Sequence, residues 1–152
     1  SNNNLKIYSQ KKPRALNFYF LLINFLAFLL KLKKINTTFA YGFDEKYFKN
    51  ERFKFRIFLF GSRLECSPLV LYESAASGLP FVSFKSGNSE EIAKKTGAGI
   101  TVNSIIEMTK VINKLFYDKK LNRKLSNAGL KNSLKFTWEK IANKYIQIFR
   151  SI

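Results

Sequence analysis

Apolar residues follow two alternating kinds of spacing along this chain. Short apolar runs rich in β-branched and aromatic residues are typical of buried strands, and longer stretches with a repeat near 3.6 residues are typical of helices. The runs that predict strands are residues 5–9, 37–41, 55–60, the segment that ends at Phe84, and residues 100–102. The stretches that predict helices are residues 15–32, 44–53, 68–77, a segment entered near residues 89–92, residues 104–117, residues 121–134, and the segment after Thr137. Because strands alternate with helices, we expect an α/β fold with a parallel sheet and helices on both faces, in one domain over residues 1–152.

The longest apolar run, residues 15–32, is open to three interpretations. A membrane-spanning helix needs roughly 20 apolar residues, and this run is slightly shorter and contains Asn17 and Asn24, although basic residues flank it on both sides. A helix lying on a membrane surface would show a polar face, and this run is apolar on nearly every side. We favour a helix buried against the sheet, because the run lies between two expected strands at βαβ spacing.

Two later helices carry apolar stripes that predict core-facing sides. The first stripe consists of Ile105, Met108, Val111, Ile112 and Leu115, and the second of Trp138, Ile141, Tyr145, Ile148 and Phe149. Stripes at this spacing usually pack on a core. We therefore expect both to be structural and assign neither to a cofactor.

Residues 55–84 carry the chemistry of the chain. The strand at 55–60 leads to the carboxyl edge of the sheet, where ligands bind in open α/β folds. We expect Ser67 to be the N-cap of the following helix, Pro68 to occupy its first position, and Gly78 to end it. The free amides of Leu69 and Val70 would then face phosphate or sugar oxygens.

Two glutamates eight positions apart, Glu65 and Glu73, lie in this same stretch. A carboxylate can accept two hydrogen bonds from neighbouring hydroxyls, such as those of a ribose. The alternative is structural: both residues would be surface charges, or Glu65 would pair with Arg63. The spacing by itself leaves this choice open.

The charge of the chain is strongly basic, with 27 Lys and Arg against 10 Asp and Glu, a net +17. Attraction to nucleic acid, anionic lipid or a phosphorylated substrate is one interpretation. A solvated lysine-rich surface shaped by codon bias is the simpler one, because the basic residues are spread over the whole chain and no nucleic-acid-binding motif occurs. A nucleic-acid partner is therefore disfavoured.

Cysteine and histidine usage narrows the chemistry further. Cys66 is the single cysteine, and the chain has no histidine. A Ser-His-Asp triad, a Cys-His pair and a histidine-ligated zinc site are therefore excluded, and an internal disulfide cannot form. We expect a reducing, cytoplasmic location.

Three strings within residues 55–150 form an ordered set of motifs: ECSPLVLYESAASGLPFVSF, GNSEEIAKKTGAGITV and the closing KFTWEKIANKYIQIF. These strings resemble the donor-binding half of GT-B glycosyltransferases of family four, and the resemblance implies a Rossmann-like nucleotide-sugar-binding domain. The family motif is E-x7-E, followed by a small-residue helix, then G-x-P-V-V, and then a glycine loop that ends in E-I. The matching positions are Glu65, Glu73, Ala75, Ala76, Gly78, Pro80, Val82, Gly87, Glu91 and Ile92.

The resemblance implies a role for each matching residue. Glu65, the residue implied to be catalytic, would contact hydroxyls of the donor sugar, and Glu73 would hold the ribose of the nucleotide. The backbone between them would meet the sugar and diphosphate, through Cys66, Ser67, Pro68 (by its carbonyl only), Leu69 and Val70. The implied reaction is retaining transfer of a hexose from a nucleotide-diphosphate sugar to a glycan or lipid-linked acceptor. The sugar nucleotide is a co-substrate, and neither a metal nor another cofactor is expected.

The chain also departs from the family pattern. The basic G-R…K-G pattern that would meet the diphosphate is missing, and the nearest equivalents are Lys11, Lys12 and Arg14. One strand–helix unit is missing between Tyr41 and Phe55, and a complete enzyme of this fold has a second Rossmann-like domain for the acceptor. We therefore expect that domain on a preceding segment or a partner chain, and we expect the isolated domain to be incomplete or inactive as an enzyme.

One alternative function belongs to another class. The apolar run with its basic flanks, residues 14–34, and the +17 charge would also suit a non-catalytic module that binds the inner face of a membrane. Peripheral membrane contact is therefore kept as a possible partner interaction.

Overall fold

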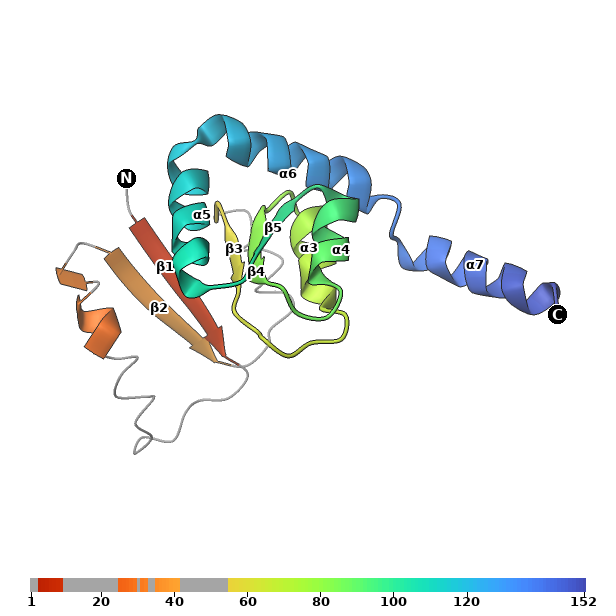
Figure 1. The fold of residues 1–152 in the computed structure, drawn as a ribbon, viewed down its shortest axis with the longest axis horizontal. Coiled ribbons are helices and arrows are strands. Elements are labelled where there is room, and N and C mark those ends of the chain that lie inside the picture. Colours follow the sequence, from red (N-terminus) through yellow and green to blue (C-terminus); the bar gives the residue numbers. More distant parts are fainter. Residues whose placement is uncertain (1–2, 10–24, 30, 33–34, 42–54) are drawn as a thin grey trace. The chain divides into compact units, whose positions relative to one another are not determined.

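The computed structural model describes residues 3–9, 25–29, 31–32, 35–41 and 55–152 (Figure 1). The chain divides into two compact units, an amino-terminal unit (Ser1–Lys49) and a carboxyl-terminal unit (Asn50–Ile152). Each unit is described by itself, and a single domain over residues 1–152 stays a prediction.

The amino-terminal unit contains the two strands expected there. Strand β1 (Asn3–Ser9) and strand β2 (Ile35–Tyr41) pair in parallel, with Leu5 opposite Thr37. The expected charged helix at 44–53 and the basic residues Lys11, Lys12 and Arg14 lie outside the described residues.

The long apolar run is described only in part, and that part corrects one expectation. Residues 25–29 are helical, but the side chains of Phe25, Leu26, Phe28, Leu29 and Leu32 are exposed. The interpretation of this run as a helix buried against the sheet is therefore not confirmed for these residues. A sheet of two strands offers little apolar surface on which such a helix could pack. Within the described ranges, no helix is both long enough and apolar enough to span a bilayer.

The carboxyl-terminal unit is built on a three-stranded parallel sheet in the order β3-β4-β5. The strands are β3 (Phe58–Phe60), β4 (Phe81–Phe84) and β5 (Gly99–Val102). Phe58 lies opposite Phe81, and Phe81 opposite Gly99. The helices are α3 (Leu69–Ala76), α4 (Ser89–Thr96), α5 (Ile105–Tyr117), α6 (Lys119–Ser133) and α7 (Trp138–Arg150).

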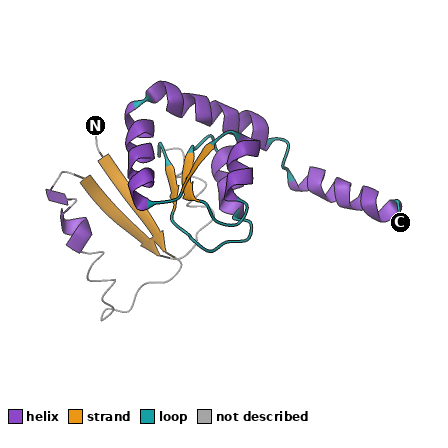
Figure 2. Cartoon of the chain, viewed as in Figure 1, coloured by secondary structure: helices purple, strands orange, loops and turns teal. Residues whose placement is uncertain are grey.

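Helices cover both faces of this sheet, as the sequence predicted (Figure 2). On one face, α3 and α4 pack on β4 through a core of Leu71, Ala75, Phe81, Ile92 and Ala98. On the other face, Val82, Phe84 and Val102 pack with Leu115, and three further members of the expected α5 stripe, Met108, Val111 and Ile112, join them. The fold is therefore a Rossmann-like α/β arrangement.

Helix α6 packs against the carboxyl-terminal ends of α3 and α4. Ser126 Oγ donates to the carbonyl of Gly78, 2.6 Å away, and Asn132 Nδ2 donates to that of Thr96 at 3.1 Å. A Cβ atom on Gly129 would lie 2.7 Å from the Ala75 carbonyl oxygen, so the two backbones approach too closely for a side chain. Both contacted helices thus keep their amino-terminal ends clear of α6.

Helix α7 corrects the expectation of a core-facing stripe. It has no buried residue within the described part of the chain, and its Trp138 and Phe149 are 73% and 72% exposed. Its 3.6-residue periodicity therefore identified an amphipathic helix correctly, but did not identify a partner for the apolar side.

Candidate functional site

The candidate site lies at the carboxyl edge of the three-stranded sheet. Because the strands are parallel, Phe60, Phe84 and Val102 end them at one edge. From there the β3–α3 loop (residues 61–68), the β4–α4 loop (residues 85–88) and a short turn lead into α3, α4 and α5. Ligands of open parallel sheets bind outside this edge.

Helix α3 begins with its amino-terminal amides free of side-chain caps. Its N-cap is Pro68, with φ −72° and ψ 97°, and no side chain in the described part of the protein caps it. The prediction that Ser67 is the N-cap is wrong, because Ser67 lies one residue before the cap position. Its Oγ instead accepts a hydrogen bond from Asn88 Nδ2, 3.1 Å away.

The end of α3 follows the prediction. Gly78 has φ +68°, in the left-handed region that favours glycine after a helix. Its amide donates to the carbonyl of Ala75 at 3.0 Å, and the amide of Leu79 donates to the carbonyl of Ser74 at 3.0 Å. The helix is therefore stopped after Ala76, and the chain enters β4.

The predicted site residues lie together along the β3–α3 loop and the first turns of α3. Cys66, Ser67, Leu69 and Glu73 are exposed, Glu65 and Val70 are half-buried, and Pro68 is buried. Among the described residues the ion pairs are Lys85–Glu90 and Lys95–Glu91, and neither involves Glu65 or Glu73. The guanidinium of Arg63 instead lies 4.4 Å from the centre of the Phe84 ring. The suggested Glu65–Arg63 pair is therefore not found there.

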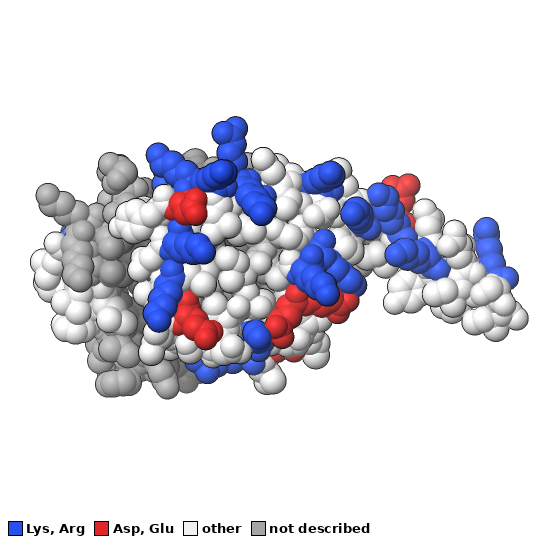
Figure 3. Space-filling view, turned by 45° about the horizontal axis from the view of Figure 1, so that its top comes forward, with Lys and Arg blue, Asp and Glu red and all other residues white. Residues whose placement is uncertain are grey.

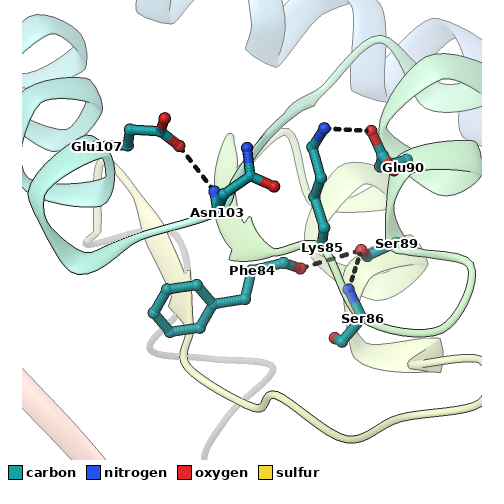
Figure 4. A network of polar contacts seen from close by, with 7 residues as sticks. All are labelled: Phe84, Lys85, Ser86, Ser89, Glu90, Asn103 and Glu107. Atoms are coloured by element: carbon teal, nitrogen blue, oxygen red, sulfur yellow. Dashed lines mark hydrogen bonds and ion pairs between the residues drawn. The ribbon is translucent and has the colours of Figure 1, made fainter.

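The β4–α4 loop supplies residues that the sequence analysis did not assign to the site. Ser89 is fully buried, and its Oγ donates to the carbonyl of Phe84 and accepts from the amide of Ser86, both at 3.0 Å (Figure 4). Ser86 Oγ donates to the carbonyl of Ser62 at 3.2 Å. The loop is thus fixed to the end of β4 and to the start of the β3–α3 loop.

The same loop contacts the backbone beside Glu65. The amide of Asn88 donates to the carbonyl of Cys66 at 3.1 Å. Gly87 has φ +51°, and a Cβ there would lie 2.2 Å from the Cys66 carbonyl oxygen and 2.5 Å from that of Glu65. Only glycine fits here, which explains why Gly87 occupies the middle of the Ser86-Gly87-Asn88 turn. The contact joins residues 21 to 22 positions apart, so local patterns could not reveal it.

Helix α5, at the same edge, has a side-chain cap at its amino terminus. Ser104 Oγ accepts from the amide of Glu107 at 3.1 Å, and Glu107 Oε2 accepts from the amide of Asn103 at 2.7 Å (Figure 4). Ser104 is therefore a side-chain N-cap of α5, and Glu107 reaches back to the residue before it. The Glu107 amide in the first turn of α5 is therefore paired within the chain.

Charge at the site is modest and distributed. On the face shown in Figure 3, Lys and Arg side chains occur at many separate places, with acidic residues among them. Lys85, just beyond β4, is held by Glu90 at 3.0 Å. On α4, a hydrogen bond with Glu91 raises the pKa of Lys95. Where the structure is described, no group of three or more potential metal ligands comes together, and metal independence stays a prediction.

Comparisons with known proteins agree with this architecture. The family model described as glycosyl transferases group 1 matches residues 26–132. Sucrose-phosphate synthase from Thermosynechococcus elongatus is similar in structure, with a TM-score of 0.76 and 23% identity. TarM and the GtfA/B complex are also similar, with TM-scores of 0.62 and 0.61 and identities of 18% and 16%. No curated protein sequence matches the chain.

The structural matches cover nearly all of this chain but a minority of each neighbour. They extend over 97%, 97% and 99% of the present sequence, and over 38%, 35% and 36% of the three solved chains, in the order given above. The chain thus spans little more than a third of the length of these proteins, and identities this low establish the fold alone.

Proposed function

Since this chain belongs to the glycosyl transferases of group 1, we propose that its carboxyl-terminal unit binds a nucleotide-diphosphate sugar. The bound sugar would be the donor for retaining transfer of a hexose to a glycan or lipid-linked acceptor. The observation that carries the proposal is the uncapped amino terminus of α3, which lies between Glu65 and Glu73 at the carboxyl edge of the sheet.

The geometry supports a division of roles along the ligand. The amides of Leu69 and Val70 are hydrogen-bond donors at the positive end of a helix, where diphosphate oxygens are favoured. Glu73 lies one turn further and is exposed, so its carboxylate is free to accept both hydroxyls of a ribose. Glu65 lies on the other side, in the loop, and would accept hydroxyls of the donor sugar.

The remaining parts of the reaction are proposed to come from elsewhere in the protein. Lys11, Lys12 and Arg14 are the proposed cations for the diphosphate. A second Rossmann-like domain, on another segment or a partner chain, would hold the acceptor, at the cytoplasmic side of a membrane. No metal is needed in this scheme, because amides and cations neutralise the leaving diphosphate.

Calorimetric titration tests the proposal directly. UDP-glucose, GDP-mannose and dTDP-glucose are titrated into the chain and into Glu73→Ala, and Glu139→Ala on α7 is the matched control. We expect one of the three to bind, and we expect Glu73→Ala to weaken it by about tenfold or more, since the ribose loses two hydrogen bonds. Absence of binding to all three, or equal affinity in the wild type and Glu73→Ala, would refute the proposal.

Exposed apolar residues favour a second candidate function, contact with a membrane surface. Phe25, Phe28 and Leu32 are exposed in one unit, and Trp138 and Phe149 in the other. Apolar side chains beside basic ones bind anionic lipid surfaces. Flotation with phosphatidylglycerol vesicles tests this function: the chain should float with the vesicles at low salt, and a chain that stays at the bottom of the gradient removes the candidate.

A further inference from the structure

Asn88 occupies the N-cap position of α4 but does not cap that helix. An asparagine there normally accepts a hydrogen bond from an amide of the first turn. In the described structure no such bond forms, and the carboxamide reaches across to Ser67 in the β3–α3 loop, where Nδ2 donates to Oγ at 3.1 Å. The side chain is therefore directed towards the proposed donor site and not towards its own helix.

The other end of the same carboxamide has no partner. Asn88 Oδ1 is buried, and none of the described residues donates a hydrogen bond to it. Buried acceptors in native structures are nearly always paired, because removal from water without a partner is unfavourable. An acceptor left free beside a ligand site indicates that the ligand provides the missing donor.

The position of Asn88 indicates which part of the ligand donates this hydrogen bond. Its backbone amide holds the carbonyl of Cys66, directly after Glu65, whereas Glu73 lies further along α3. Diphosphate oxygens are acceptors and cannot satisfy an amide oxygen, but a sugar hydroxyl can donate to it. The bond from Asn88 Nδ2 to Ser67 Oγ is exposed, so the carboxamide lies at the rim of the proposed site.

We propose that Asn88 is a specificity-determining residue of the donor site, whose side-chain oxygen accepts a hydrogen bond from a hydroxyl of the transferred sugar. This inference rests on the proposed function, since it needs a bound sugar nucleotide. It also assigns Ser67 a positioning role, because the Ser67 hydroxyl fixes the carboxamide.

The test compares nucleotides with and without their sugar. The affinities of UDP, UDP-glucose, GDP and GDP-mannose are measured by calorimetry for the wild type, Asn88→Ala, Asn88→Asp and Ser67→Ala. Asn143→Ala on α7 is the control, since Asn143 is an exposed asparagine outside the β3–α3 and β4–α4 loops. Asn88→Ala keeps the backbone bond to Cys66, so the β3–α3 loop stays held while the side-chain oxygen is lost.

We expect Asn88→Ala to weaken the binding of the sugar nucleotide about tenfold, and to weaken the binding of the matching nucleoside diphosphate less than about twofold. Asn88→Asp keeps an acceptor oxygen and should restore most of the sugar affinity, and Ser67→Ala should show a smaller, sugar-selective loss. A purely structural role would weaken both ligands equally, and that result, or no change at all, overturns the inference. If Asn88→Ala does not fold, Ser67→Ala decides by the same comparison.

The experiment separates this inference from the proposal on which it rests. If the wild type binds none of the four nucleotides, the proposed function fails and the role of Asn88 fails with it. If the wild type binds a sugar nucleotide and Asn88→Ala affects it no more than the nucleoside diphosphate, the inference alone fails.

Discussion

Helices α3 and α5 begin at the same edge of the same sheet, yet their first turns differ. Ser104 caps α5 by accepting from the Glu107 amide, and Glu107 accepts in turn from the amide of Asn103. The start of α3 has Pro68 at the N-cap and no capping side chain among the described residues. Helix α4 also begins without a side-chain cap, because the side chain of Asn88 contacts Ser67 and not an amide of α4. The difference identifies the part of the edge where a ligand can complete the hydrogen bonding.

The remaining helices of the carboxyl-terminal unit, α6 and α7, have side-chain N-caps as α5 does. Asp118 caps α6 through the amide of Leu121, and Thr137 caps α7 through the amide of Lys140. An absent cap costs a helix about 1 kcal/mol. A local rule that is broken at α3 and α4 and kept elsewhere is typical of a functional site.

The largest expected effect comes from Gly87→Ala. The new Cβ would enter the space of the Cys66 and Glu65 carbonyls, and φ +51° is unfavourable for alanine. We expect the free energy of unfolding to fall by roughly 1–3 kcal/mol and sugar-nucleotide binding to be lost, because the loop beside Glu65 must move. Urea denaturation and calorimetry measure the two effects.

Gly61→Ala is the matched control for that change. A Cβ on Gly61 meets nothing within 4 Å, so stability and affinity should both stay close to wild type. Equal behaviour of the two alanine variants would contradict the role given to the β4–α4 loop.

A smaller effect is expected when a cap is added to α3. Pro68→Asp places a carboxylate where it can accept from the first amides of the helix and repel a diphosphate. We expect UDP to bind about tenfold more weakly. Thr137→Asp makes the same charge change at the N-cap of α7 and should leave affinity unaltered. If both variants bind UDP equally well, α3 is not the diphosphate site.

The smallest effect is expected when the cap of α5 is removed. Ser104→Ala should lower the free energy of unfolding by about 1 kcal/mol, the usual value of an N-cap, and leave UDP affinity unchanged. Urea denaturation and calorimetry again provide the values. A loss of affinity as large as that of Pro68→Asp would show that the two helix starts do not differ in function.

The sequence allowed the architecture of the carboxyl-terminal unit to be predicted from local features. The alternation of strands and helices, the left-handed Gly78 and the α5 stripe follow from periodicity and turn chemistry, which act over a few residues. These features needed no knowledge of distant contacts. The roles of Glu65 and Glu73 were implied by the family resemblance and stay predictions.

Other features depended on information that is not local. Ser67 was predicted to be the N-cap of α3, but Pro68 has that position, and the contact of Ser67 with Asn88, 21 positions away, cannot be read from the local sequence. The close approach of Gly87 to Cys66 joins separate loops. The exposure of α7 shows that periodicity identifies an apolar side but not what covers it.

The most direct test of the account follows individual amides during a titration. In a ¹⁵N-labelled sample of the chain, UDP is added while the resonances of Leu69 and Val70 at the start of α3 are compared with those of Ile105 and Ile106 at the start of α5. The account predicts saturable shifts at Leu69 and Val70, with Ile105 and Ile106 unmoved, because α3 begins between Glu65 and Glu73 and has no side-chain cap, whereas α5 is capped by Ser104. Shifts at the start of α5 with none at α3 would contradict it.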